Sequence, residues 1–193
     1  MATESFVGLV ASFTVVAFAE MGDKTQLIAF SLATRYRQPW TVMLGILIAT
    51  TLNHALASWA GAWVSTKVPE SLLAGVLGLG FIAFAVWTLF PDTVAEPAPR
   101  RRWGPLIATA VIFFFAEMGD KTQLATVALG ARFASPVAVT TGTTAGMLAA
   151  DGLAVFAGTR LATSIPMPVL RGIAAALFLL FALAAIGRAL GLV

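Results

Sequence analysis

Two short segments of identical sequence hold most of the acidic residues that fall within apolar stretches of the chain. Both read Glu-Met-Gly-Asp-Lys-Thr, and we call them motif one (residues 20–25) and motif two (residues 117–122). Carboxylates with neutral oxygens nearby suit hard divalent cations such as Ca²⁺, Mg²⁺ or Mn²⁺ better than Zn²⁺ or copper. The principal candidate metal ligands are the four acids of the motifs, namely Glu20, Asp23, Glu117 and Asp120.

Other side chains in the motifs and in the apolar stretches are candidates for additional metal ligands or for an ion pathway. They are Met21, Lys24, Thr25, Gln26, Asn53, His54, Met118, Lys121, Thr122, Gln123 and Asp151. A methionine beside a carboxylate either packs against its neighbours or biases a site toward a softer ion, Mn²⁺ rather than Ca²⁺. His54, the only histidine, is either a hydrogen-bonded packing residue, a proton carrier or a ligand.

The charges within the two motifs do not cancel. A charged side chain at the bilayer centre costs about 2.5–3.5 kcal/mol on insertion scales, so these groups must face the protein interior and be neutralised. Each lysine could pair with the aspartate immediately before it, as in Asp23–Lys24. Two lysines still leave two of the four carboxylates without a counter-charge. One divalent cation or two protons would balance them.

The backbone of the motifs has two conformations open to it. In a continuous helix, Glu20, Asp23 and Lys24 would share one face, because residues three and four apart are neighbours on a helix surface. Alternatively, Gly22 and Gly119 allow a break in the helix, which frees backbone carbonyl oxygens for a cation as in the discontinuous helices of transporters.

The elements that carry these residues are predicted to be six transmembrane helices in an all-α membrane protein. The 193 residues are 59% hydrophobic and 11% charged, whereas a soluble domain has roughly 25% charged residues. Prolines and charged clusters divide the chain into spans at about 5–33, 40–65, 71–90, 106–131, 136–164 and 169–190. The first span is predicted to be a retained helix, because Glu4 is the only charge before the first motif and a signal peptide begins with positive charges.

The chain contains an internal repeat. An offset of 97 residues superimposes nine consecutive identical residues, Ala19–Leu27 on Ala116–Leu124, and aligns Pro39 with Pro136. We therefore predict a first three-helix repeat at residues 1–90, a cytoplasmic linker at 91–105 and a second repeat at 106–193. Because each repeat has an odd number of spans, the two repeats must be inverted, which is how many secondary transporters build a site near the midplane.

The basic residues of the loops predict the orientation of the chain. One side of the membrane carries seven of them, Arg35, Arg37, Arg100, Arg101, Arg102, Arg160 and Arg171, and the other side carries three, Lys67, Arg132 and Arg188. The positive-inside bias places the first group in the cytoplasm and both termini outside. A net charge of +3 scattered over loops does not indicate nucleic-acid binding, and the absence of cysteine excludes disulfides and thiolate metal sites.

The doubled pattern E-x-G-D-[KR]-[TS], present as Glu20–Thr25 and Glu117–Thr122, resembles the second Ca²⁺:cation antiporter family. This family includes Golgi Mn²⁺/Ca²⁺ transporters and bacterial manganese exporters, and the resemblance covers essentially the whole chain. It implies export of Mn²⁺ or Ca²⁺ from the cytoplasm in exchange for protons, with the four motif acids as ligands and the metal as substrate rather than cofactor. The chain lacks the long N-terminal extension of eukaryotic members, which implies a multi-pass protein of the bacterial inner membrane.

The sequence therefore favours a secondary active transporter over an enzyme. One alternative is an exporter of a small organic solute. Another is a metal-dependent intramembrane hydrolase, which a single histidine and two symmetric motifs disfavour. The sequence does not decide between Mn²⁺ and Ca²⁺. It does not determine the oligomeric state either, and it is compatible with a homo-oligomer.

Overall fold

The computed structural model describes residues 2–90, 103–164 and 167–192, with the side chains of residues 2, 157–164 and 167 excepted. All regular structure in these ranges is α-helical. The helices are α1 (Ala2–Glu20), α2 (Lys24–Tyr36), α3 (Pro39–Ser65), α4 (Glu70–Thr88), α5 (Pro105–Glu117), α6 (Lys121–Phe133), α7 (Pro136–Ser164) and α8 (Met167–Ala189). The prediction of an all-α protein is confirmed. Most of the predicted linker, including Arg100–Arg102, lies outside the described residues, as does the side chain of Arg160.

Four of the described helices are long and apolar enough to cross a membrane. These segments are Thr3–Glu20, Pro39–Ser65, Glu70–Thr88 and Pro168–Ala189. The apolar helix α5 is shorter, because it ends at motif two. At 1.5 Å per residue, the 27 residues of α3 span about 40 Å, more than the roughly 30 Å of a bilayer core.

The helix ends follow from local sequence. Pro39, Pro105 and Pro136 each open a helix, where the missing N–H costs no intrahelical hydrogen bond. The two motif helices that follow the breaks end alike. Arg37 after α2 and Ala134 after α6 adopt left-handed backbone conformations, with φ of 54° and 48°, and their N–H groups donate to carbonyls four residues earlier. These two caps are equivalent positions of the repeat.

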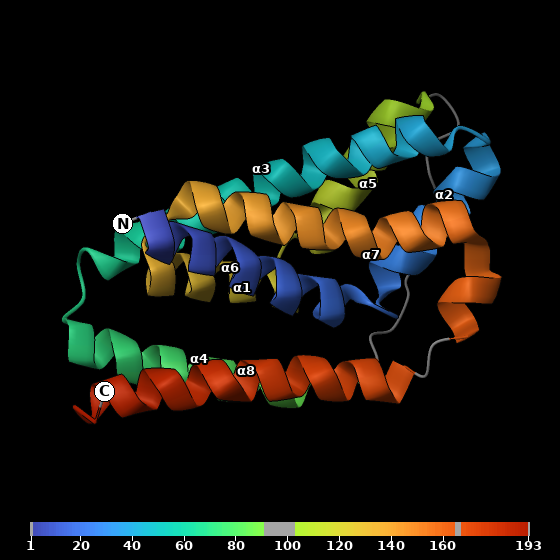
Figure 1. Ribbon diagram of the computed structural model, residues 1–193. Helices are drawn as coiled ribbons and strands as arrows, with labels where there is room; N and C mark the ends of the chain where they lie inside the picture. Colours follow the sequence, from blue (N-terminus) through green and yellow to red (C-terminus); the bar gives the residue numbers. More distant parts are fainter. Residues whose placement is uncertain (1, 91–102, 165–166, 193) are drawn as a thin grey trace.

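The helices run side by side along one long direction, and the described N-terminal and C-terminal ends lie at the same end of the bundle (Figure 1). α1 packs along α7, and α3 packs against α5, α6 and α7. α4 and α8 form a separate pair along one side of this group (Figure 1).

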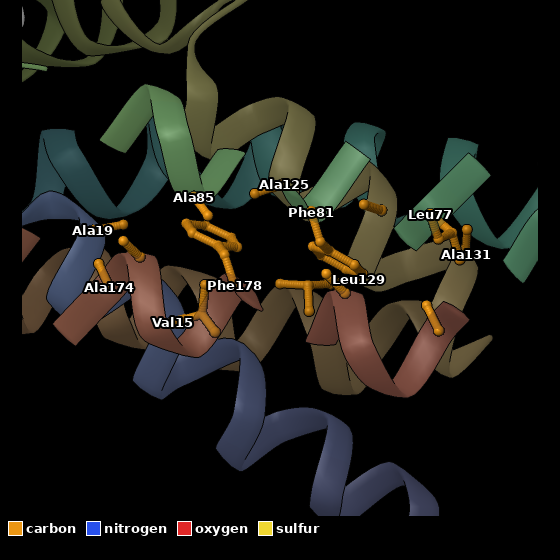
Figure 2. Close-up of a cluster of buried hydrophobic side chains, with 14 of the residues drawn as sticks. Val15, Ala19, Leu77, Phe81, Ala85, Ala125, Leu129, Ala131, Ala174 and Phe178 are labelled. Carbon is orange, nitrogen blue, oxygen red and sulfur yellow. The ribbon is translucent and has the colours of Figure 1, made fainter. Parts of the chain in front are cut away.

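Two apolar clusters fill the space between the helices. The larger one joins α1, α4, α6 and α8 through side chains such as Val15, Leu129 and Phe178 (Figure 2). Within it, the rings of Phe81 and Phe178 stack with their centroids 6.3 Å apart. The second cluster joins α1, α2, α3, α5 and α7 around the fully buried Phe113. Neighbouring residues of α1 belong to the two different clusters, so this helix is packed on both sides.

Close contacts at two equivalent glycines show how well the packing preserves the repeat. A Cβ placed on Gly142 of α7 would lie 2.3 Å from the carbonyl oxygen of Leu9 in α1. A Cβ on Gly45 of α3 would lie 3.0 Å from the carbonyl oxygen of Leu106 in α5. The repeat offset of 97 residues relates Gly45 to Gly142 and Leu9 to Leu106, so the α1–α7 and α3–α5 contacts are equivalent in the repeat.

Candidate cation site between the two motifs

Each motif breaks a helix in two. α1 ends at Glu20 and α2 begins at Lys24, and the corresponding break separates α5 from α6. Gly22 and Gly119 adopt φ of 79° and 80°, a region in which a side chain would be strained. The predicted break is confirmed, and the alternative of a continuous helix with Glu20, Asp23 and Lys24 on one face is wrong, because glycine allows the chain to turn at this position.

Glutamine side chains hold the two breaks in shape. Gln26 accepts a hydrogen bond from the N–H of Gly22 at 3.0 Å, and Gln123 accepts one from the N–H of Gly119 at 2.6 Å. The amide of Gln26 also donates to the carbonyl oxygen of Ala150 in α7 at 2.7 Å. The glutamines were predicted as candidate ligands, and the structure uses the oxygen of each one to satisfy a backbone donor.

The ion pairs connect the motifs to each other. Lys121 donates to Asp23 at 2.6 Å, and Lys24 lies 3.2 Å from Asp120. The prediction that each lysine pairs with the aspartate before it is therefore wrong. Each aspartate is the N-cap of a helix and the lysine is its first residue, and adjacent residues at a helix start point in different directions. The lysines instead reach across the gap between α2 and α6.

Glu20 is fully buried and accepts hydrogen bonds from both motifs. Thr25 of its own motif donates to one carboxylate oxygen at 2.8 Å, and Thr122 of motif two donates to the other. Glu117 is also fully buried, but neither of its carboxylate oxygens has a hydrogen-bond partner among the described residues. The threonines predicted to supply neutral oxygens thus act here as donors to Glu20.

Three acids from the two motifs converge on one point. Carboxylate oxygens of Glu20, Glu117 and Asp120 lie within 4.8 Å of one another, and all three residues are buried. We call this group the carboxylate triad. Ca²⁺–oxygen distances are about 2.3–2.6 Å, so oxygens at this spacing can share one cation. The second oxygen of Asp120 is buried without a hydrogen-bond partner in the described chain, which leaves it available to an ion.

The remaining predicted residues divide between the site and the helix packing. Asp23 is buried next to the triad in its pair with Lys121, outside the group of mutually close oxygens. Met118 is 51% exposed, unlike the buried carboxylates, and Met21 is half-buried. Asn53 donates to the carbonyl oxygen of Phe114 at 2.9 Å, a contact between helices.

His54 and Asp151 occupy equivalent positions on α3 and α7, and both are fully buried. A ring nitrogen of His54 lies 3.5 Å from the hydroxyl of Thr144. Neither oxygen of Asp151 has a hydrogen-bond partner among the described residues.

Sequence reasoning missed the hydroxyl contacts between α3 and α7. Ser58 and Thr140 share a hydrogen bond of 2.6 Å and both are buried. Hydroxyl residues that recur along two apolar helices were the available signal.

Comparison with known proteins gives consistent results for both halves of the chain. The model of a family described as "Divalent cation/proton antiporter GDT1" matches residues 8–96 and again residues 105–191. A Vibrio cholerae serotype O1 protein named "Putative manganese exporter" is 44% identical over 94% of this chain and 92% of its own length. The Oryza sativa subsp. japonica "GDT1-like protein 2, chloroplastic" is 33% identical, with 92% of this chain and 60% of that protein covered.

A similar relative is the "Protein PAM71-homolog, chloroplastic" of Arabidopsis thaliana, which is 33% identical over 92% of this chain. The alignment covers 58% of that protein, so the chain spans about three fifths of both chloroplast relatives. No solved structure matches the chain.

Proposed function

Because the chain belongs to the GDT1 family of divalent cation/proton antiporters, we propose that it exports Mn²⁺ from the cytoplasm in exchange for protons. The family resemblance predicted from the doubled motif is confirmed. The protein is accordingly a multi-pass membrane transporter and not an enzyme, and the metal ion is its substrate rather than a cofactor. The name of the Vibrio cholerae relative favours Mn²⁺ over Ca²⁺ as the transported ion.

The observation that carries this proposal is the carboxylate triad with its two unequal glutamates. The two lysines form ion pairs with the two aspartates across the motifs, and their two positive charges face four carboxylates, so two negative charges remain in the motifs. Two negative charges match one divalent cation. A buried carboxylate without donors, such as Glu117, is strongly destabilised unless it binds a cation or a proton.

Competition at the same oxygens can couple the two transported species. When a divalent cation binds Glu20, Glu117 and Asp120, it displaces protons from the carboxylates. When the ion leaves, protons can neutralise the two glutamates and allow the empty protein to return. The proposed ligands in this state are thus the three acids of the triad. Asp23, the fourth acid predicted from the sequence, is paired with Lys121 and does not bind the ion in this state.

We further propose that residues 1–90 and 106–193 form two inverted three-span repeats joined by a cytoplasmic linker at 91–105. In this arrangement α1 with α2 and α5 with α6 are the two broken spans, and α3, α4, α7 and α8 are the other four. The double family match, the reciprocal ion pairs and the equivalent glycine contacts support the repeat. The shared end of the two termini supports placing both on the same side of the membrane (Figure 1), and the basic residues of the loops favour the outside of the bacterial inner membrane for that side.

Alternating access would follow from rocking one repeat against the other around the fixed motifs. Because the repeats are equivalent, the opposite state should exchange the roles of the two motifs. Asp23 would then join Glu20 and Glu117, and Asp120 would withdraw into its pair with Lys24. Whether Asp120 or Asp23 binds the ion would thus indicate to which side of the membrane the site is open.

The test is Mn²⁺ uptake into proteoliposomes that contain the purified protein, with and without a pH gradient. We expect uptake that depends on the gradient and is accompanied by proton movement in the opposite direction. Glu117→Gln should abolish both fluxes, whereas Lys67→Gln, in the α3–α4 turn, should leave them intact. Equal Mn²⁺ fluxes in wild type and Glu117→Gln would refute the proposed site. Uptake of Ca²⁺ measured in the same vesicles distinguishes the two ions. The absence of both Mn²⁺ and Ca²⁺ uptake would favour an organic substrate.

A further inference from the structure

Asp151 is the buried acid that the proposed ion site does not use. It lies on α7, which packs along α1 through close contacts at two glycines. Gly142 approaches the carbonyl oxygen of Leu9, and Gly146 approaches that of Phe13. Four residues along α7 thus correspond to four along α1, so the two helices run side by side in the same direction. Five residues beyond Gly146, Asp151 lies at the level of Phe18 by this register, which is within one helical turn of Glu20.

The environment of Asp151 differs from that of an acid used for packing. Its side chain has 0% exposure, and both carboxylate oxygens lack a hydrogen-bond partner among the described residues. It lies within one helical turn of Glu20 along the neighbouring helix α1. A buried polar side chain kept for structure would normally be hydrogen-bonded to a neighbouring helix, as the amide of Asn53 is. A charged carboxylate buried in this way destabilises the protein unless a cation or a proton neutralises it.

The lysines of the site do not supply that charge. Lys24 and Lys121 already pair with Asp120 and Asp23. His54, the repeat equivalent of Asp151, has a ring nitrogen at 3.5 Å from Thr144, and no ion pair links it to Asp151 in the described chain. Together the four motif acids and Asp151 carry five negative charges against the two positive charges of these lysines, so three negative charges remain. One divalent cation in the triad balances two of them.

We propose that Asp151 is a further ligand for the transported cation, which gives the ion a second position between Asp151 and Glu20 on the α7 side of the triad. This inference rests on the proposed function, since it names a residue of the same transport route. Glu20 would be shared by the two positions. An ion leaving the triad would move to Asp151 without losing all of its carboxylate ligands. The repeat supplies an acid at one of the two equivalent positions only, so this second position would exist on one side of the triad.

Mn²⁺ binding to the purified protein tests the proposal directly. Free Mn²⁺ has a sharp electron paramagnetic resonance signal that broadens when the ion binds, so a titration yields the affinity without transport. We expect Asp151→Asn to weaken Mn²⁺ binding by about tenfold, which corresponds to about 1.4 kcal/mol, and Asp151→Glu to restore much of it. The matched control is Thr143→Val, because Thr143 is buried on the same helix and its hydroxyl bonds only to carbonyls of that helix.

The stability of the metal-free protein separates a ligand from a structural residue. If Asp151 binds the cation, Asp151→Asn should leave the Tm without metal unchanged or higher, and should reduce the rise in Tm that Mn²⁺ produces in wild type. A lower Tm without metal, or an Mn²⁺ affinity equal to that of wild type, would overturn the inference and leave the triad standing. A wild-type protein that binds no Mn²⁺ in the same titration would overturn the proposed function itself.

Discussion

Motif one and motif two have the same six residues but different surroundings. Glu20 accepts hydrogen bonds from two threonines, whereas Glu117 accepts none from the described residues. The side chain of Lys24 is 22% exposed and that of Lys121 only 7%. Asp120 belongs to the carboxylate triad and Asp23 does not. Identical sequences thus have unequal surroundings in this structure, as the proposed inverted repeat would have in one of its two proposed states.

The two motifs are identical in sequence, but the structure gives their side chains different hydrogen bonds and different exposure. The doubled motif supplies two equivalent sets of candidate ligands, and the structure brings together three of their four acids. The neighbouring helices decide which of these acids converge, since each motif packs against a different set of partners. Substitutions at paired positions of the two motifs should therefore give unequal effects, and these can be ranked.

The largest difference should separate the two glutamates. Glu117→Gln removes a charge that has no hydrogen-bond donor among the described residues, so Mn²⁺ binding and transport should both be lost. The same change should raise the stability of the metal-free protein by roughly 1–3 kcal/mol, because an unpartnered buried charge disappears. Glu20→Gln should also stop transport but should lower stability, because the amide keeps only one acceptor oxygen and one of the two threonine hydroxyls loses its partner. Thermal unfolding without metal measures both, and a common sign of the two stability changes would contradict the asymmetry.

The aspartates should separate binding from transport. Asp120→Asn should weaken Mn²⁺ binding by about tenfold, or about 1.4 kcal/mol, whereas Asp23→Asn should change it much less in the state described here. Both should stop sustained transport, because each aspartate is needed in one of the two states. Equilibrium titration followed by vesicle flux on the same preparations provides the comparison. Equal losses of affinity in the two variants would show that the aspartates do not exchange roles.

The lysines should differ in their effect on stability. Lys121→Met leaves Asp23 charged in a buried site, and breaking a buried pair in this way costs on the order of 3–5 kcal/mol. Lys24→Met should cost distinctly less, because Lys24 is partly exposed and water already screens its pair with Asp120. Denaturation in detergent measures the two changes. The combined variant Lys121→Asp with Asp23→Lys should recover part of the loss, which a mere packing role of Lys121 would not allow.

The smallest effect should come from the backbone of the break. Gly119→Ala places a side chain at φ of 80°, where no atom lies within 4 Å of the new Cβ. The cost is then conformational, about 1–2 kcal/mol. Gly172→Ala is the matched control, since its Cβ also meets open space and the residue lies within α8, where alanine is favoured over glycine. A loss of stability in both variants would mean that the left-handed backbone at Gly119 is not the cause.

The helix boundaries could largely be predicted, because the prolines and glycines that start and break helices act on the local backbone. Pro39 and Pro136 start helices where proline is tolerated, and Gly22 and Gly119 mark the breaks where a positive φ is required. The acids of the site were also identifiable, because charged residues inside apolar helices are costly and must have a role. The pairing of these charges was mispredicted, since it depends on how α2 and α6 face each other and not on the order of residues along the chain.

The sequence by itself determined that two equivalent acidic motifs, each with a glycine that permits a helix break, lie within apolar stretches, and that their lysines neutralise only half of their carboxylates. Both follow from composition and spacing, which any fold of this chain must accommodate. Only the tertiary structure decided that Lys121 bonds to Asp23 and that Thr122 reaches Glu20. It also decided that Glu117 and Asp151 accept no hydrogen bond within the described part of the chain. The reason is that hydrogen bonds and ion pairs act over a few ångströms, so helix packing selects among partners that the repeat presents as equivalent.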